Sequence, residues 1–339
     1  MTIEAREGDF IEDINRVIFD VKGLVHPADR IVAFPRFIPS FSGNRKRKNT
    51  LYGKVYALSE RFRFIRQSFP DYLVHDSVSD ERLCEVPKDN VKRRYEPVEK
   101  LQGLRNSKDL EPLEARALQF AELLKDHART SWRTIGISGS ILVGLHTESS
   151  DIDPVVYGSE ACWKTHSALT NLLKQKSGPF RAYDHEGLKA LFDFRSKDTA
   201  GSIKDFVRTE SRKVIQGKFM GTDFFVRFVK DWSEIDEKYG DVHYRNVGYA
   251  RIKATVVEDS ESIFTPSKYS IEGVTVIEGN KVQPLNEIAS FRGRFCEQAK
   301  EGEVVVAQGK VERVIDKKHD HEYFRLLLGN KPSDFMTLA

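Results

Sequence analysis

The sequence predicts a multidomain α/β (α+β) protein, in which a central mixed-sheet domain is flanked by a small N-terminal α+β module and a C-terminal β-barrel-like domain. Three observations support this prediction. The chain has 339 residues, whereas the core of one domain commonly holds roughly 100–200 residues. Helical and strand-like patterns alternate in the first part of the chain, and short β runs separated by glycine turns follow one another in the last part. We therefore expect domains at 1–108, 109–240 and 241–339.

The composition is typical of a folded, soluble and highly charged protein, with 40% hydrophobic and 31% charged residues. A net charge of only +3 does not by itself indicate nucleic acid as a partner. Cys84, Cys162 and Cys296 are too few and too far apart for a disulfide framework or a zinc site. The sequence has no run of about 18 consecutive apolar residues. We therefore expect a cytoplasmic protein that neither enters a membrane nor is secreted.

The N-terminal module contains a predicted helix at 52–67, preceded by the basic run RKRK at 45–48. As a functional element this run would contact phosphate or nucleic acid. The commoner role of such a run is a solvated loop, and we favour that interpretation. Within the predicted helix, Phe62, Ile65 and Phe69 recur at helical spacing and indicate a face that packs on a core.

The central domain is predicted to alternate helices and strands before it ends in a hairpin. The hairpin turns at Gly221, and its second strand carries the acidic and basic residues discussed below. The predicted elements are helices at 109–127, 141–146, 160–176 and 186–213, strands at 134–137 and 152–158, and the hairpin at 217–230.

A turn of small residues, Gly139-Ser140, separates the predicted strand at 134–137 from the helix that follows. Glycine lets a ligand approach the backbone closely, and serine offers a hydroxyl group. The N–H groups at the start of a helix point toward an anion. The turn is therefore predicted to form a cradle for phosphate groups.

Two aspartates, Asp151 and Asp153, flank Ile152 at the start of the next predicted strand. Alternation along a strand places both carboxylates on one face. Mg²⁺ in proteins typically takes one or two carboxylates together with phosphate oxygens, so we expect these aspartates to hold Mg²⁺ or Mn²⁺. The gap from Ser140 to Asp151 is long enough for a short helix and a return to the neighbouring strand, which would bring cradle and carboxylates together.

Each half of this pattern has a purely structural alternative, since glycine-serine turns are common and Asp-x-Asp often caps a loop. Together, at this spacing, Gly139-Ser140 and Asp151-Ile152-Asp153 resemble the signature of the DNA polymerase β-like nucleotidyltransferase superfamily, over roughly residues 133–230. The runs SGSILVGLHTESSDID and GLVHPADRIVAF are also similar to archaeal proteins of uncharacterised activity that are regarded as nucleotidyltransferases. The resemblance implies a nucleotidyltransferase domain at 109–240, with Asp151 and Asp153 as catalytic metal ligands and Gly139 and Ser140 as nucleotide-binding residues.

The chain departs from the superfamily pattern in two places. Pro154 follows the aspartates where an apolar strand residue is usual, and because proline cannot donate to a ladder it indicates an edge or a bulge. The superfamily also has a third catalytic carboxylate on a later antiparallel strand. Asp223 is the candidate here, with a solvated aspartate beside a turn as the alternative. Arg227, on the same face, would bind a nucleotide phosphate or form a surface ion pair.

The predicted activity is Mg²⁺-dependent transfer of NMP from an NTP to an acceptor hydroxyl on RNA or protein, with release of pyrophosphate. The alternative is a catalytically inactive nucleotide- or RNA-binding protein on the same fold. His146 is expected to form a hydrogen bond at a helix end rather than bind zinc. Lys213 and Lys218 are expected to be solvated cations rather than contacts to the triphosphate.

Overall fold

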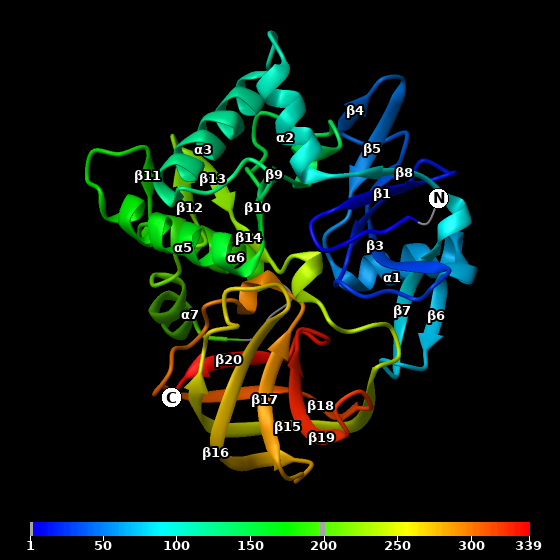
Figure 1. The fold of residues 1–339 in the computed structure, drawn as a ribbon, viewed down its shortest axis with the longest axis vertical. Coiled ribbons are helices and arrows are strands. Elements are labelled where there is room, and N and C mark those ends of the chain that lie inside the picture. The colour runs from blue at the N-terminus through cyan, green and yellow to red at the C-terminus, as the bar shows by residue number, and fades with distance from the viewer. Residues whose placement is uncertain (1–2, 197–200) are drawn as a thin grey trace. The chain divides into compact units, whose positions relative to one another are not determined.

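The computed structural model describes residues 3–196 and 201–339. They form a mixed α+β structure with several sheets (Figure 1), which confirms the fold class that the sequence predicts. The chain divides into two compact units, and the first takes in both the predicted N-terminal module and most of the predicted central domain. The first unit comprises Met1–His75, Arg82–Ala182 and Val214–Asp236, and the second comprises Asp76–Glu81, Tyr183–Lys213 and Glu237–Ala339.

An eight-stranded sheet forms the N-terminal part of the first unit. Its strand order is β4-β5-β3-β2-β1-β8, and β7 pairs with both β3 and β6. The strands are β1 (Phe10–Asp13), β2 (Ile18–Val21), β3 (Arg30–Pro39), β4 (Arg45–Arg47), β5 (Thr50–Lys54), β6 (Leu73–Asp76), β7 (Glu81–Pro87) and β8 (Val91–Tyr95), with short 3-10 helices η1 (Pro70–Tyr72) and η2 (Lys88–Asn90) between them.

Helix α1 (Leu58–Ser68) packs on this sheet through the predicted apolar stripe. Ile65 is fully buried, and Phe62 and Phe69 pack against the same core cluster, so the stripe is confirmed. The helix begins later than predicted because residues 50–54 pair as strand β5 instead.

The basic run at 45–48 is not the solvated loop that we favoured, because most of it forms strand β4 in a hairpin with β5. Strand alternation divides the cations between two faces. Lys46 and Lys48 are exposed, whereas Arg45 and Arg47 are half-buried. Arg47 forms an ion pair with Glu12 at 2.9 Å. The loop prediction is therefore wrong for the two arginines, which face the interior of the first unit.

His26 is held between two backbone groups at the edge of the same core. The Val32 N–H donates to Nδ1 at 3.2 Å, and Nε2–H donates to the Ala5 carbonyl at 2.9 Å, an arrangement that requires the neutral ring. Burial, the largest influence, lowers the pKa of His26 to about 4. His26 therefore resists protonation in the folded state.

We expect this histidine to make the fold sensitive to acid. The unfolded chain takes up the proton near pH 6.5 and the folded chain only near pH 4, so stability on the order of 2 kcal/mol is lost as pH falls through this window. The free energy of unfolding by urea, measured across the window for wild type and His26→Gln, checks this. The difference between the two curves should change with pH, and parallel curves would contradict the expectation.

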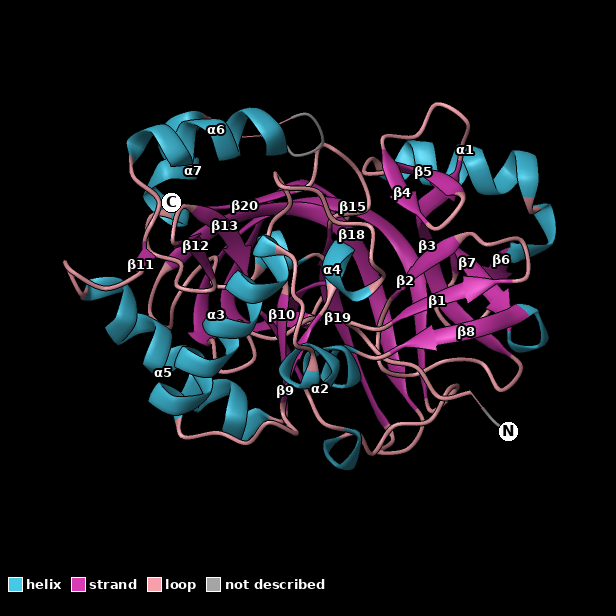
Figure 2. Ribbon diagram, turned by 90° about the horizontal axis from the view of Figure 1, so that it is seen from above, coloured by secondary structure: helices cyan, strands magenta, loops and turns pink. Residues whose placement is uncertain are grey.

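The rest of the first unit contains two small sheets and three helices longer than one turn. The antiparallel pair β9 and β10 is joined by β14, which runs parallel to β10, while β11, β12 and β13 form an antiparallel sheet. Helices α3 and α5 pack against each other (Figure 2). The elements are α2 (Pro97–Asn106), α3 (Pro112–Ala128), β9 (Ile135–Ile137), α4 (Gly139–Leu142), β10 (Pro154–Tyr157), α5 (Ser159–Lys174), β11 (Phe180–Arg181), β12 (Gln216–Phe219), β13 (Thr222–Phe225), β14 (Arg227–Val229) and η3 (Trp232–Glu234).

Several of these elements confirm the sequence pattern. Pro112 begins α3, where its missing N–H is tolerated, and a capping box between Glu111 and Glu114 fixes the helix start. The hairpin of β12 and β13 turns at Met220 and Gly221, both with positive φ. Pro154, however, is at neither an edge nor a bulge. It is the first residue of β10, the central strand of its sheet, which is another position where a strand tolerates proline.

The second unit is built around a closed sheet, which confirms the barrel-like prediction. The path β15-β16-β17-β19-β18 returns to β15, and β20 pairs with β18. One pair, β17 with β19, is parallel, so the barrel is not wholly antiparallel. The elements are β15 (Val242–Glu258), β16 (Ser267–Gly279), β17 (Leu285–Ser290), η4 (Gly293–Phe295), β18 (Val304–Asp316), β19 (His321–Leu328) and β20 (Phe335–Leu338).

The long helix predicted at 186–213 is wrong. Its described parts form two helices in the second unit, α6 (His185–Arg195) and α7 (Ile203–Glu210), and residues 197–200 of the prediction lie outside the described residues. Ser202 begins α7 by accepting a hydrogen bond from the Asp205 N–H at 3.1 Å, which is the capping signal that divides the segment. Among the described helices, none is long and apolar enough to span a membrane.

Candidate functional site

The turn at Gly139 and the aspartate pair meet in the structure. Gly139 has a φ of +63°, and a Cβ atom placed on it would lie 1.8 Å from Oδ2 of Asp153. The backbone is tied in the same place, since the Ser138 N–H donates to the Asp153 carbonyl at 2.8 Å. Only glycine fits here, because of both the backbone conformation and the space. The two halves of the sequence pattern therefore form one site.

The helix after the turn is much shorter than predicted. Helix α4 covers only Gly139–Leu142, and the chain turns again at Gly144, with a φ of +65°. A single turn has little macrodipole, because that field is a sum over aligned peptides. The expected contribution of a helix dipole to phosphate binding is thus small, and the site depends on its side chains and its close backbone approach.

Ser140 has a hydroxyl group that the protein does not satisfy. The residue is 2% exposed, and Oγ has no hydrogen-bond partner among the described residues. A buried hydroxyl without a partner destabilises a fold by about 1–3 kcal/mol. Its presence beside Gly139 is explained if a ligand oxygen bonds to it.

We expect Ser140→Ala to separate stability from ligand binding. Removing the unsatisfied hydroxyl should leave the free energy of unfolding unchanged or raise it by about 1 kcal/mol, while affinity for Mg-NTP falls by about tenfold. Thermal unfolding without ligand and calorimetric titration with a non-hydrolysable NTP check both parts. A variant that binds NTP as wild type does would show that the hydroxyl is not a ligand contact.

Asp151 and Asp153 are half-buried and flank the fully buried Ile152. Ile152 forms a parallel bridge with Phe224, donating to the Asp223 carbonyl at 2.9 Å and accepting from the Phe225 N–H at 3.1 Å. Alternation then places both carboxylates on the face opposite to Ile152, as predicted. Burial first, and then the charge of Asp151, raises the pKa of Asp153 to about 7. Two carboxylates this close favour a cation between them.

Asp223, the candidate third acid, is a backbone neighbour of this pair. Because Ile152 and Phe224 are paired in parallel, Asp151 and Asp223 lie side by side on the same face of the sheet. The Asp223 side chain is 53% exposed and forms an ion pair with Lys218 at 3.0 Å. The acid therefore lies beside the site on a solvent-exposed strand, with its charge partly compensated.

Arg227 lies on β14, where it pairs in register with Val155 of β10. Its guanidinium forms an ion pair with Glu7, whose side chain is fully buried. Glu7 also accepts from Lys22 at 3.2 Å and from the Gly23 N–H at 2.8 Å. The structure thus gives Arg227 a carboxylate partner, and its binding of nucleotide phosphate stays a prediction.

The N-terminal sheet contributes charged residues that the sequence did not reveal as part of this site. Burial and Asp151 have the largest effects on the pKa of Asp153, and Arg36 of β3 and Lys54 of β5 lower it while Asp20 of β2 raises it, so all three act electrostatically on Asp153. Arg45 of β4 donates to the Leu145 carbonyl and to the Ser150 hydroxyl, the latter at 3.3 Å. It thereby ties down the loop that ends at the aspartates. If the run is taken as a strand, alternation within RKRK separates Arg45 and Arg47 from Lys46, and this signal could have indicated Arg45.

The donor set fits Mg²⁺ bound together with a phosphate ligand. Among the described residues, no three His, Cys, Asp or Glu side chains are grouped so that they could hold a metal ion. Mg²⁺ is commonly bound through one or two carboxylates plus substrate phosphates. Asp151 and Asp153 are such a pair, and Ser140, with its unsatisfied hydroxyl, follows directly on Gly139, which approaches Asp153. The residues therefore fit a metal that is bound together with a phosphate-bearing ligand.

The remaining residues singled out in the sequence have other partners. His146 Nε2 lies 2.8 Å from Oε2 of Glu111 at the start of α3, which confirms a hydrogen-bonding role. Lys213 is buried rather than solvated, and it donates to Glu210, to Gln298 and to the Arg294 carbonyl. Lys218 is the partner of Asp223 described above. Both lysines therefore already form ion pairs with acidic residues of the protein.

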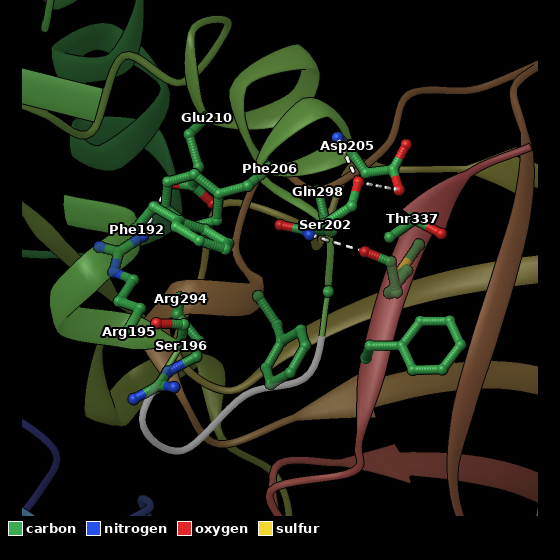
Figure 3. A pocket seen from close by; sticks show the side chains of 14 residues that line it. Phe192, Arg195, Ser196, Ser202, Asp205, Phe206, Glu210, Arg294, Gln298 and Thr337 are labelled. Atoms are coloured by element: carbon green, nitrogen blue, oxygen red, sulfur yellow. Dashed lines mark hydrogen bonds and ion pairs between the residues drawn. The ribbon is translucent and has the colours of Figure 1, made fainter. Parts of the chain in front are cut away.

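Two hollows in the described surface are lined by other residues. In the second unit, a small cavity of about 50 Å³ lies between α6, α7 and β20, with the ion pair of Arg195 and Glu210 in its wall (Figure 3). In the first unit, a groove of about 380 Å³ lined by β8, α2 and α3 reaches α4 at Leu142. The lining of neither hollow includes Gly139, Asp151 or Asp153. The candidate site is therefore distinct from both hollows, and its chemistry identifies it.

Comparison with known proteins identifies a relative along the whole chain. The chain is 30% identical over 342 residues to "Uncharacterized protein MJ1086" of Methanocaldococcus jannaschii, and the match covers 98% of each protein. No protein-family profile matches the chain. No solved structure matches it either. Identity at this level over nearly the full length shows common descent, and the chain belongs to the same family as this M. jannaschii protein.

Proposed function

We propose that the protein is a Mg²⁺-dependent nucleotidyltransferase of the DNA polymerase β-like type, which transfers NMP from an NTP to an acceptor hydroxyl on RNA or protein and releases pyrophosphate. The observation that carries this proposal is the approach of Gly139 to the Asp153 carboxylate, beside the unsatisfied Ser140 hydroxyl. Phosphoryl-group transfer needs positioning and charge stabilisation more than covalent chemistry. A site made of a tight turn and paired carboxylates supplies both.

Each residue has a defined role in this proposal. Asp151 and Asp153 would hold Mg²⁺ or Mn²⁺, which when bound neutralises charge on the α-phosphate and the leaving pyrophosphate. Gly139 lets the triphosphate approach the backbone, and Ser140 donates its hydroxyl to a phosphate oxygen. Asp223 would accept the proton of the attacking hydroxyl, a role supported by its position beside Asp151.

The experiment that tests the proposal is a transfer assay with each α-labelled NTP in turn, using total RNA or total protein as acceptor and Mg²⁺ or Mn²⁺ as metal. We expect label to enter one acceptor class with one preferred base. Digestion of the product with RNase or with protease separates RNA from protein as acceptor. Absence of transfer with every NTP, acceptor and metal would refute the enzymatic assignment.

A second candidate is a nucleotide- or RNA-binding protein without catalytic activity on the same fold. The ion pair of Asp223 with Lys218 favours this second candidate. Lys218 partly compensates the charge of Asp223, and the Asp223 side chain is exposed to solvent, unlike the half-buried Asp151 and Asp153. Such a protein would bind ATP without releasing pyrophosphate. Measuring ATP binding and pyrophosphate release on the same sample distinguishes the two candidates.

Asp223→Asn tests the third acid directly. If Asp223 accepts the proton, we expect the variant to lose transfer by about a hundredfold, with NTP affinity retained. Lys218→Ala is the matched control, because it breaks the same exposed ion pair and leaves the carboxylate in place. Both variants should change the free energy of unfolding by less than about 1 kcal/mol, as exposed pairs contribute little. Full activity in Asp223→Asn would remove this residue from the catalytic set.

A further inference from the structure

We propose that Arg36 and Lys54 of the N-terminal sheet bind the β- and γ-phosphates of the NTP, so that the triphosphate lies between these two cations and the Asp151–Asp153 pair. This inference rests on the proposed function and deepens it, because it names the residues that select a polyphosphate. It also makes the N-terminal sheet part of the nucleotide site and not only a packing partner.

Both cations are half-buried and lack an acidic partner. Within the described residues, no carboxylate lies within ion-pair distance of Arg36 or Lys54. Their surroundings differ from those of other half-buried cations in the same unit, such as Arg47, Arg94 and Lys22, each of which has an acid at 2.8–2.9 Å. A half-buried charge without a counter-ion is unfavourable, and an anionic ligand would relieve it.

A β-bulge places Arg36 in this position. Ile18 of β2 pairs with Phe37 and the next residue, Phe19, pairs with Pro35, so Arg36 is an extra residue on β3. Bulges of this kind re-aim a side chain and are frequent beside active sites. The guanidinium lowers the pKa of Asp153, although burial and Asp151 have larger, opposite effects. The bulge thus changes the face on which this strand presents Arg36, next to the β4–β5 hairpin whose Arg45 reaches Ser150, the residue before Asp151, at 3.3 Å.

Tyr56 holds the two cations side by side. The Arg36 guanidinium and the Lys54 ammonium each lie 4.6 Å from the centre of the Tyr56 ring. Two positive charges on one ring repel each other, and the positive charge of Arg36 also lowers the pKa of Arg45, on which burial has the larger effect. The ring face partly offsets this repulsion. We assign Tyr56 as a positioning residue for the pair.

Charge balance favours a triphosphate as the anion. A metal ion of charge +2 offsets the two aspartates and leaves the roughly four negative charges of an NTP to be neutralised by other groups. Arg36 and Lys54 supply two positive charges from the opposite side. An RNA backbone is a less suitable partner, because a nucleic-acid backbone is commonly bound by solvent-exposed cations, and the exposed cations here are elsewhere, with Lys46 on the other face of the hairpin and Lys48 in its turn.

The test measures binding of α,β-methylene-ATP, ADP, AMP and inorganic tripolyphosphate to the full chain in Mg²⁺, for wild type, Arg36→Ala, Lys54→Ala and Lys46→Ala. We expect each of the first two variants to weaken binding of the ATP analogue and of tripolyphosphate by about tenfold, with AMP binding unchanged. Lys46→Ala is the matched control, since it removes the same charge from an exposed position, and it should bind as wild type does. Arg36→Lys, which keeps the charge, should recover part of the affinity.

The outcomes separate this inference from the proposed function. If wild type transfers label from NTP and Arg36→Ala and Lys54→Ala bind the ATP analogue no worse than Lys46→Ala, the cation role is wrong and the enzymatic assignment stands. If these variants lose affinity for RNA and not for the analogue, the cations contact the acceptor and the inference is overturned. If wild type binds no nucleotide at all, both proposals fail. Tyr56→Phe should match wild type, whereas Tyr56→Leu should weaken analogue binding.

Discussion

Asp153→Asn should abolish nucleotidyl transfer, with a fall in activity of about a thousandfold or more, and leave a folded protein. The substitution removes one of the two carboxylates proposed to hold the metal but keeps the size of the side chain. Transfer of label from the preferred α-labelled NTP at saturating Mg²⁺ measures the loss. Activity equal to wild type would show that Asp153 has no part in the reaction.

The same variant has a second readout that does not depend on catalysis. Burial and Asp151 raise the pKa of Asp153 to about 7 in the folded protein, so in the metal-free wild type the stability contributed by this group falls as pH rises from about 4 to about 7. Asn carries no charge, and we expect Asp153→Asn to be more stable than wild type by about 1–2 kcal/mol near pH 8 and to lose this advantage near pH 4. Denaturant unfolding at both pH values checks the expectation. An advantage that is absent near pH 8, or equal at both pH values, would contradict it.

Gly139→Ala should also cause a large loss of nucleotidyl transfer, but for a different physical reason from Asp153→Asn. The left-handed backbone disfavours any side chain, and the new Cβ would lie 1.8 Å from Oδ2 of Asp153. The carboxylate or the turn must therefore shift, and a shift of this size at a site that works by positioning reduces activity by about a hundredfold or more. The transfer assay and thermal unfolding together measure both consequences.

Gly144→Ala is the matched control for this substitution. Gly144 has nearly the same φ, +65°, but nothing lies within 4 Å of a Cβ placed there. Both variants should lose about 1 kcal/mol to backbone strain. Only Gly139→Ala should also lose activity, and equal activity of the two variants would mean that the approach of Gly139 to Asp153 is not functional.

Local patterns in the sequence were sufficient to predict much of the fold. The start of α3 at Pro112 and the hairpin that turns at Gly221 each depend on neighbours a few residues apart, and both were confirmed. The buried Ile152 between two half-buried aspartates also agrees with the predicted alternation, although β10 itself begins only at Pro154. The helix predicted at 52–67 was wrong at its start, because the observed helix begins at Leu58. The helix predicted at 186–213 was wrong in its continuity, because its described parts form two helices. In both cases a competing local signal, a strand pairing at 50–54 and a serine cap at Ser202, decided the structure.

The parts of the site that the sequence did not predict come from contacts between distant segments. Arg36 is a single charge between apolar residues of β3, and its position depends on a bulge relative to β2 that the sequence of β3 alone does not reveal. The ion pair of Arg227 with Glu7 joins residues at opposite ends of the first unit's sequence. Such pairings depend on the register of whole strands, which no single stretch of sequence specifies.

A crystal structure of the protein with Mn²⁺ and a non-hydrolysable NTP, solved with anomalous data, tests the central claim most directly. We expect an anomalous peak bound by the carboxylates of both Asp151 and Asp153, with the triphosphate against Gly139 and the Ser140 hydroxyl. A nucleotide bound elsewhere, or a turn and aspartate pair that remain without metal at saturating concentrations of both ligands, would contradict the assignment.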